Sequence, residues 1–299
     1  MFIFFSQSIF ILLLNLFHRR IYMSESYLKS KKILSPKLDV VFQALFGEVG
    51  SEKITGRFLQ SILKQEVSEV DLSQNTVLRR EQEDDKLGIL DIMAKINEKE
   101  YCNIEMQLVD TGEIRERILY YWSKIYARQL KKGQKYRELE KTIVILIANF
   151  EIKGLEDLKY HTEWKIMDKE TQKVILTDKF ELRIIELPKI KEEEQEELID
   201  WLLFLENPQS ERVKTKMEEN EELKEAVEKL EGMSEDDYMQ RIADLREKAI
   251  LDYNSGMGNA LRKGIKKGKL ETAKKMLEKG MDIDTIIEVT GLSKEEIVS

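Results

Sequence analysis

Three polar residues, Asp91, Glu105 and Gln107, lie in two short apolar segments that are typical of neighbouring β-strands. Side chains alternate between the two faces of a strand, so Glu105 and Gln107 share one face of their strand. On the other strand, Asp91 is on the face that does not carry the apolar residues. A hairpin loop of three residues would place Asp91 opposite Gln107, and one of five residues would place it opposite Glu105; in both cases all three polar groups would converge. A loop of two or four residues without a bulge would separate them.

Asp91 and Glu105 could hold a divalent cation, because two carboxylates on one face of a sheet repel each other and a cation relieves that repulsion. Mg²⁺ takes oxygen ligands and retains several waters. Water activated by such a cation can attack a phosphodiester, and the cation also stabilises the charge that builds on the phosphate. The same two residues could instead be ordinary surface residues of a half-exposed sheet, and the spacing alone leaves both interpretations open.

The 299 residues include one cysteine, Cys102, and two histidines, His18 and His161. A single cysteine excludes a disulfide framework, and these three residues cannot assemble a Cys/His zinc site. A Ser-His-Asp hydrolase is disfavoured as well, since its chemistry needs an imidazole beside the nucleophile. Any metal is therefore expected on oxygen ligands. Cys102 stands in an apolar context and is expected to be a small core residue.

The segments that must position these residues alternate between helix and strand. Apolar residues at helical spacing between Leu38 and Leu63 predict two helices with a break near Gly47. A third helix is expected over residues 113–131, ending before Gly133. Extended segments are expected at residues 76–82, 87–96, 101–108, 142–148, 164–166 and 180–187. This order predicts an α/β unit that ends near Pro188.

The net charge of −8 is unevenly distributed along the chain. Residues 191–248 contain 20 acidic and 9 basic residues, a net charge of −11, which leaves +3 for the rest of the chain. We interpret the acidic runs as solvated helix faces. Residues 261–279 have the opposite balance, with a net charge of +6. A nucleic-acid partner is therefore not excluded, although no wide basic surface is expected.

The first 17 residues are apolar, but they lack the features of a targeting segment. No basic residue precedes the apolar run and no small-x-small cleavage site follows it. The run is also short for a membrane span, which needs about 20 residues. A second methionine, Met23, opens a polar stretch. We expect residues 1–22 to be a mis-assigned N-terminal extension, with an anchor or a signal peptide as alternatives, and a cytoplasmic protein without membrane contact.

Four stretches of the chain carry a family resemblance. They are LSPKLDVVFQALFG (residues 34–47), GILDIMAKINEKEYCNIEMQ (88–107), the run through Tyr121, Lys124 and Tyr126 to GQKY (133–136), and the tail that begins LRKGIKKGKLETAKKML at Leu261. Together they resemble the recombination-promoting nuclease/transposase family of the PD-(D/E)XK nuclease superfamily, over about residues 33–297. The resemblance implies an α/β (α+β) core of helix, three strands, helix and strand, followed by a helical C-terminal region.

The resemblance also implies roles for individual residues. Asp91 takes the place of the carboxylate that bridges metal and scissile phosphate, Glu105 that of the second metal ligand, and the backbone carbonyl of Met106 is a further expected ligand. Gln107 stands where the superfamily motif has lysine, so it can orient water but supplies no positive charge. Asp39 could approach the same metal, or could be a helix N-terminal residue that interacts with the helix dipole.

The cofactor implied by the resemblance is Mg²⁺, or another divalent cation such as Mn²⁺ or Ca²⁺, and the implied partner is double-stranded DNA. Lys86 and Arg79 could contact DNA phosphates, although an ordinary exposed charge is the favoured interpretation of each. The aromatic residues Tyr120, Tyr121, Trp122 and Tyr126 recur at helical spacing, which favours core packing over stacking on bases.

These observations lead us to expect a metal-dependent DNA endonuclease associated with recombination or mobile elements. A non-catalytic DNA-binding or regulatory protein is the alternative, because residues 283–297 could form a helix-turn-helix beside the basic segment. The same tail could be a helical hairpin used for self-association, which would make a homo-oligomer. The expected units are a nuclease domain (33–190), an acidic helical region (191–250) and a basic segment with a helix-turn-helix-like tail (251–299).

Overall fold

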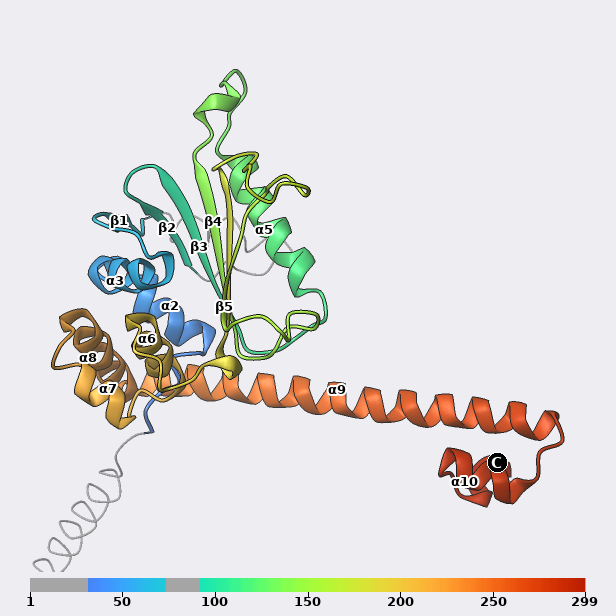
Figure 1. Ribbon diagram of the computed structural model, residues 1–299. Helices are drawn as coiled ribbons and strands as arrows, with labels where there is room; N and C mark the ends of the chain where they lie inside the picture. The colour runs from blue at the N-terminus through green and yellow to red at the C-terminus, as the bar shows by residue number, and fades with distance from the viewer. Residues whose placement is uncertain (1–31, 74–91, 299) are drawn as a thin grey trace, which may run out of the picture. The chain divides into compact units, whose positions relative to one another are not determined.

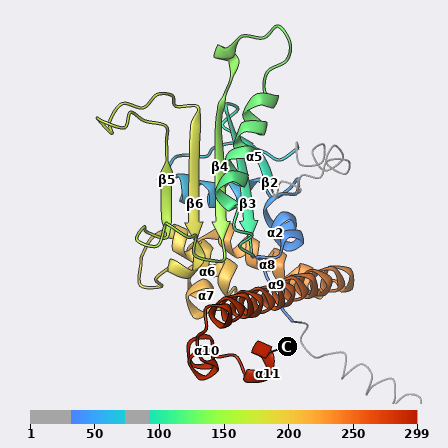
Figure 2. The same ribbon diagram turned by 90° about the vertical axis from the view of Figure 1, so that its right-hand side faces the viewer.

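The structure of the protein is a computed structural model that describes residues 32–73 and 92–298. Within these ranges a six-stranded sheet has the order β1-β2-β3-β4-β6-β5 (Figures 1 and 2). Its strands are β1 (Val70–Asp71), β2 (Ile92–Ile96), β3 (Glu100–Gln107), β4 (Lys141–Ala148), β5 (His161–Trp164) and β6 (Phe180–Glu186). The central strands β3, β4 and β6 are parallel, and the outer pairs are antiparallel.

The central strand β4 is the apolar run that the sequence predicts for a strand buried on both faces. Helix α5 (Ile114–Arg128) covers one of those faces (Figure 1). The apolar residues shared between α5 and that face include Ile114, Ile118, Ile125, Met93, Val144 and Leu146. The spacing of three to four residues along α5 gives this helix one apolar side, and burying that side fixes the helix on the sheet.

A second layer contains α2 (Asp39–Phe46), α3 (Glu52–Leu63) and α6 (Glu197–Glu206). Phe46 and Phe58 lie 4.8 Å apart between ring centroids, and Trp201 of α6 lies 5.6 Å from Phe58. Helix α2 ends at Gly47, where an added Cβ would lie 3.1 Å from Cγ1 of Ile92. The end of α2 is therefore packed closely against β2.

Two further helices complete this part of the molecule, α7 (Glu211–Lys216) and α8 (Glu221–Glu235). Lys229 of α8 donates hydrogen bonds to the carbonyl of Ala44 and to Oγ of Ser51, both at 2.6 Å. Burial lowers the pKa of Lys229, although nearby glutamates act in the opposite direction. A lysine at this position satisfies a carbonyl in the last turn of α2, which that helix itself leaves unpaired.

A row of ion pairs crosses the sheet on the face opposite to α5. Lys141 on β4 pairs with Glu181 on β6 at 2.9 Å and with Glu100 on β3 at 3.5 Å. Arg183 on β6 then joins Glu181 at 2.7 Å to Glu163 on β5 at 2.9 Å. Burial raises the pKa of Glu181, but hydrogen bonds from Lys141 and Arg183 outweigh it and leave the pKa below its usual value.

The chain divides into two compact units, residues 1–243 and 244–299. Helix α9 (Asp237–Glu278) spans the division and is followed by α10 (Ile283–Thr290) and α11 (Lys294–Val298). In the second unit Ala273, Ile286, Leu292 and Ile297 form a small buried cluster. No helix within the described residues is long and apolar enough to cross a membrane. The domain limits expected at residues 190 and 250 stay predictions.

The α/β core follows the order of elements that the sequence predicts. The strands expected at 101–108 and 142–148 and the helix expected at 113–131 correspond to β3, β4 and α5. The strand expected at 164–166 lies slightly earlier, as β5, because His161 to Trp164 pair with β6 while Ile166 is exposed. The strand expected at 76–82 lies outside the described residues, and the strand expected at 87–96 is described from Ile92 onward.

Candidate functional site

Strand β3 carries Asn103, Glu105 and Gln107 on the face that α5 covers. Asn103 pairs with Met93 on one side and Val144 on the other, and Glu105 pairs with Leu146. These apolar partners all belong to the cluster beneath α5. Glu105 is only 2% exposed, whereas Gln107, the last residue of the strand, is partly exposed. The structure thus places the predicted carboxylate in a largely apolar environment, close to the point where β3 reaches the surface.

The hairpin before this site has a loop of three residues, Asn97 to Lys99, since Ile96 pairs with Glu100. Asn97 and Glu98 have φ angles of 50° and 56°, the left-handed conformation found in tight hairpin turns. The described pairing of β2 with β3 begins at Ile92, which faces Ile104. These two residues are the sequence neighbours of Asp91 and Glu105. The expectation that a three-residue loop gives the register with Asp91 opposite Gln107 is therefore wrong, because the turn is centred on Glu98 and not on Lys99. Asp91 itself lies outside the described residues, as do Arg79 and Lys86.

The carboxylate of Glu105 is held by its neighbour on the same face of the strand. Nδ2 of Asn103 donates a hydrogen bond of 2.8 Å to Oε1 of Glu105. An ionised carboxylate only accepts hydrogen bonds, so this contact fixes which end of the amide points to Glu105. Oδ1 of Asn103 is buried and finds no hydrogen-bond donor among the described residues. An unsatisfied buried acceptor costs about 1–3 kcal/mol, and it calls for an explanation such as a bound water or ion.

The described part of the predicted ligand set suits a divalent cation. The carboxylate of Glu105 is a hard oxygen group, the kind that Mg²⁺, Mn²⁺ and Ca²⁺ prefer, and so is the neighbouring amide oxygen of Asn103, which was not among the predicted ligands. Within residues 32–73 and 92–298 no group of three or more histidine, cysteine or acidic residues could hold a metal. Glu105 is the only one of the two principal predicted ligands in those ranges, so the complete set is not visible there. Cys102 is fully buried, and burial raises the pKa of its thiol, which agrees with its expected place in the core.

The structure also places three other residues of the predicted site. The side chain of Met106 is buried on the opposite face from Glu105, next to Ile147 on β4. The backbone carbonyl of Gln107 accepts a hydrogen bond of 2.8 Å from the backbone amide of Asn149. Asp39 is the exposed first residue of α2, and its Oδ1 accepts a hydrogen bond from the amide of Val40. Their predicted roles as ligands or catalytic groups stay predictions.

Helix α5 brings basic and aromatic side chains to the layer above the sheet. Nε of Arg117 is buried without a hydrogen-bond partner among the described residues, and the guanidinium lies 5.8 Å from the ring centroid of Tyr121. Trp122 donates from Nε1 to the carbonyl of Thr142 at 2.9 Å and packs edge-on against Phe180. The packing interpretation is therefore confirmed for Trp122. It is wrong for Tyr120, which is 42% exposed because it lies on the solvent side of α5.

Sequence reasoning missed the hydrogen bond from Asn103 to Glu105 and the buried Nε of Arg117. The signal for Asn103 was present, because it precedes Glu105 by two residues and must share its face of the strand. Its bond to Glu105 depends on a side-chain rotamer, which the sequence pattern does not contain. The burial of Arg117 depends on how α5 is rotated on the sheet, and a single basic residue within a helix carries no signal for that.

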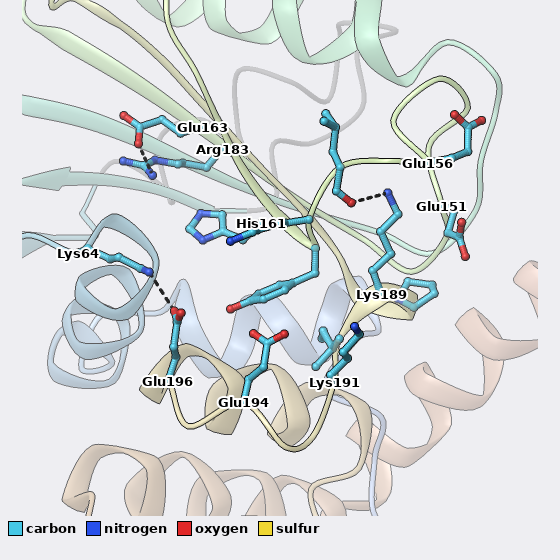
Figure 3. A pocket seen from close by; sticks show the side chains of 15 residues that line it. Lys64, Glu151, Glu156, His161, Glu163, Arg183, Lys189, Lys191, Glu194 and Glu196 are labelled. Atoms are coloured by element: carbon cyan, nitrogen blue, oxygen red, sulfur yellow. Dashed lines mark hydrogen bonds and ion pairs between the residues drawn. The ribbon is translucent and has the colours of Figure 1, made fainter.

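A pocket of about 920 Å³ lies elsewhere, along the edge strand β5 (Figure 3). Its lining is mixed in charge: Lys64 pairs with Glu196 at 2.9 Å, and Arg183 pairs with Glu163. His161 also lines it, and burial, with Arg183 and Lys64 close by, lowers the pKa of its imidazole to about 4. None of the predicted site residues that the structure describes lines this pocket. We therefore do not assign the predicted chemistry to it.

Comparison with known protein families shows which family the chain belongs to. The family model described as "PD-(D/E)XK nuclease family transposase" matches residues 36–260, and the model described as "Rpn/YhgA-like nuclease family, C-terminal HTH domain" matches residues 266–299. No curated protein and no solved structure matches. The first match spans most of the chain, including β3 and the elements on both faces of the sheet. The chain therefore belongs to the PD-(D/E)XK nuclease family transposases.

Proposed function

We propose that this protein is a divalent-cation-dependent endonuclease that cleaves phosphodiester bonds in double-stranded DNA during recombination or the movement of mobile elements. The observation that carries the proposal is the buried carboxylate of Glu105, held by Asn103 on the strand that carries the NIEMQ sequence. A carboxylate that is 2% exposed is costly to keep ionised unless it is hydrogen-bonded or neutralised by a positive charge. A divalent cation beside Glu105 would favour the ionised carboxylate further, in addition to the hydrogen bond from Asn103.

In this proposal Asp91 and Glu105 hold the cation, with the carbonyl of Met106 and, in one arrangement, Asp39 as further ligands. Mg²⁺ is the expected ion, and Mn²⁺ or Ca²⁺ could take its place. When bound, such a cation stabilises negative charge on the phosphate and lowers the pKa of water. Gln107 then has the task of orienting water through its amide, because it carries no charge. Arg79 and Lys86 are proposed contacts for DNA phosphates.

The proposal is tested by incubating purified protein with supercoiled plasmid DNA and either Mg²⁺ or Mn²⁺. We expect nicked or linear product that appears only with the cation and is abolished by EDTA. Full cleavage in EDTA would contradict the cation requirement. A complete lack of cleavage with either ion, by protein shown to be folded, would contradict the endonuclease assignment.

A second candidate function is non-catalytic DNA binding through the C-terminal unit. The helix-turn-helix match over residues 266–299 favours it, together with the arrangement of α10 and α11. Gly291 between them has a φ of 66°, a conformation that glycine adopts readily. Oγ of Ser293, the residue before α11, accepts a hydrogen bond from the backbone amide of Glu296. This alternative predicts a DNA gel shift that persists in EDTA while no product forms in Mg²⁺. The endonuclease proposal predicts that product forms.

Self-association through α9 is the form of homo-oligomer that we propose. Tyr253, Met257, Leu261 and Ile265 recur every fourth residue along α9 and are 41% to 65% exposed. An adjacent ridge of the helix holds the small residues Gly256, Ala260, Gly264 and Gly268. Each glycine lowers helix stability by about 1 kcal/mol relative to alanine, a cost that close approach of a second helix could offset.

The charges along α9 favour an antiparallel pair of copies. Residues 237–252 carry a net charge of −1, and residues 262–278 carry +5. A parallel pair would bring the two +5 segments together, whereas an antiparallel pair places each beside a −1 segment. We expect a dimer in light scattering that Met257→Glu and Leu261→Glu convert to monomer. An unchanged mass for the double variant would contradict pairing through this face.

A further inference from the structure

Asn103 is completely buried, and the two ends of its amide are in different situations. Nδ2 donates to Oε1 of Glu105 at 2.8 Å, while Oδ1 has no hydrogen-bond donor among the described residues. The strand neighbours of Asn103 are Met93 and Val144, which are both apolar and buried. A leucine or valine would suit such surroundings better, so packing alone does not account for an amide at this position.

We infer that Asn103 is a positioning residue for the cation, and this inference rests on the proposed function. Its Nδ2 restricts the rotation of the Glu105 carboxylate, and its Oδ1 accepts a hydrogen bond from water beside the cation. Both ends of the amide then have partners, which removes the unsatisfied acceptor. Partners of this kind orient a metal ligand and commonly change metal affinity or activity by about 10–100-fold.

A merely structural role makes a different prediction. If the bond from Asn103 to Glu105 only stabilises the packing of β3, replacing Asn103 should lower the stability of the protein and leave its cation affinity unchanged. Cys102 supplies a matched control, because it is the preceding residue on β3, is equally buried, and points to the other face of the sheet. Truncating Cys102 disturbs the packing of the same strand without touching Glu105.

The test measures Mn²⁺ binding by isothermal titration calorimetry, without DNA, for wild type, Asn103→Ala, Asn103→Ser, Cys102→Ala and Glu105→Gln. We expect Asn103→Ala to weaken Mn²⁺ binding at least about 10-fold. Asn103→Ser retains a short hydroxyl, so its Mn²⁺ affinity should fall between those of Asn103→Ala and wild type. The Mn²⁺ affinity of Cys102→Ala should remain within about twofold of wild type. Circular dichroism establishes that each variant is folded. If Asn103→Ala does not fold, Asn103→Ser decides the question by the same criterion.

Three results would overturn the inference, and they can be told apart. Mn²⁺ binding by Asn103→Ala, or by the serine variant in its place, that equals wild type while Glu105→Gln loses binding would overturn the role of Asn103 and leave the proposed function intact. Absence of Mn²⁺ binding by wild type itself at millimolar concentration would overturn both, because no cation would then be positioned. An equal loss of affinity in Asn103→Ala and Cys102→Ala would also overturn the inference, since general disturbance of β3 would explain it.

Discussion

Ile92 on β2 faces Ile104 on β3, and both side chains are completely buried. Their pairing sets the register of the two strands at the end of the hairpin nearest the candidate site. A strand that slips by one residue moves all its side chains to the other face, so two fully buried isoleucines hold this register firmly. The residues that follow Ile104 and precede Ile92 in sequence are the two proposed cation ligands, Glu105 and Asp91.

Gln107 is expected to influence turnover through water and charge. Gln107→Lys adds a positive charge beside the scissile phosphate and should retain or increase the rate, whereas Gln107→Leu removes the hydrogen bonds and should lower it about 10–100-fold. Single-turnover cleavage across a Mg²⁺ titration measures both. A leucine variant as fast as wild type would show that Gln107 has no catalytic role. A lysine variant rescued only by high Mg²⁺ would show that its charge displaces the cation.

His161 is expected to make the protein less stable in mild acid. Burial lowers the pKa of its imidazole to about 4, below the value of 6.5 for an exposed histidine. The unfolded chain therefore binds more protons between these two values, and stability declines as pH falls from about 6.5 to about 4. Replacing His161 with glutamine should remove up to about 3 kcal/mol of that decline. Urea unfolding of wild type and His161→Gln at intervals between these two pH values measures the free energy of unfolding. The same pH dependence of that free energy in both proteins would contradict the prediction.

Two glycines are expected to respond oppositely to alanine. A Cβ at Gly47 would lie 2.9 Å from the carbonyl oxygen of Gln43 and 3.1 Å from Ile92, so Gly47→Ala should destabilise by about 1–3 kcal/mol. A Cβ at Gly232, within α8, would meet nothing within 4 Å, so Gly232→Ala should stabilise by about 1 kcal/mol. Thermal unfolding of the two variants compares them directly. A stabilised Gly47→Ala would contradict the close packing of α2 on β2.

The sequence predicts the core well where short-range patterns decide the structure. The β2–β3 hairpin, α5 and β4 follow from alternation, helical spacing and one long apolar run. Long-range side-chain contacts cannot be predicted from such short-range patterns. The pairs that join Lys141 to Glu100 and Glu181 depend on which strands become neighbours, and β6 lies beside β4 although β5 comes between them in the chain. The bond from Asn103 to Glu105 likewise depends on rotamers fixed only by the packed sheet.

The central claim is that buried Glu105 belongs to a cation site that cleaves DNA. Plasmid cleavage in Mg²⁺ by Glu105→Gln tests it most directly, beside Asp91→Ala and a control, Glu181→Gln, which changes another buried carboxylate on the same sheet. We predict that Glu105→Gln and Asp91→Ala lose at least about 100-fold in rate while remaining folded, and that Glu181→Gln, although less stable, cleaves DNA within about threefold of wild type. Cleavage by folded Glu105→Gln at the wild-type rate would contradict the account.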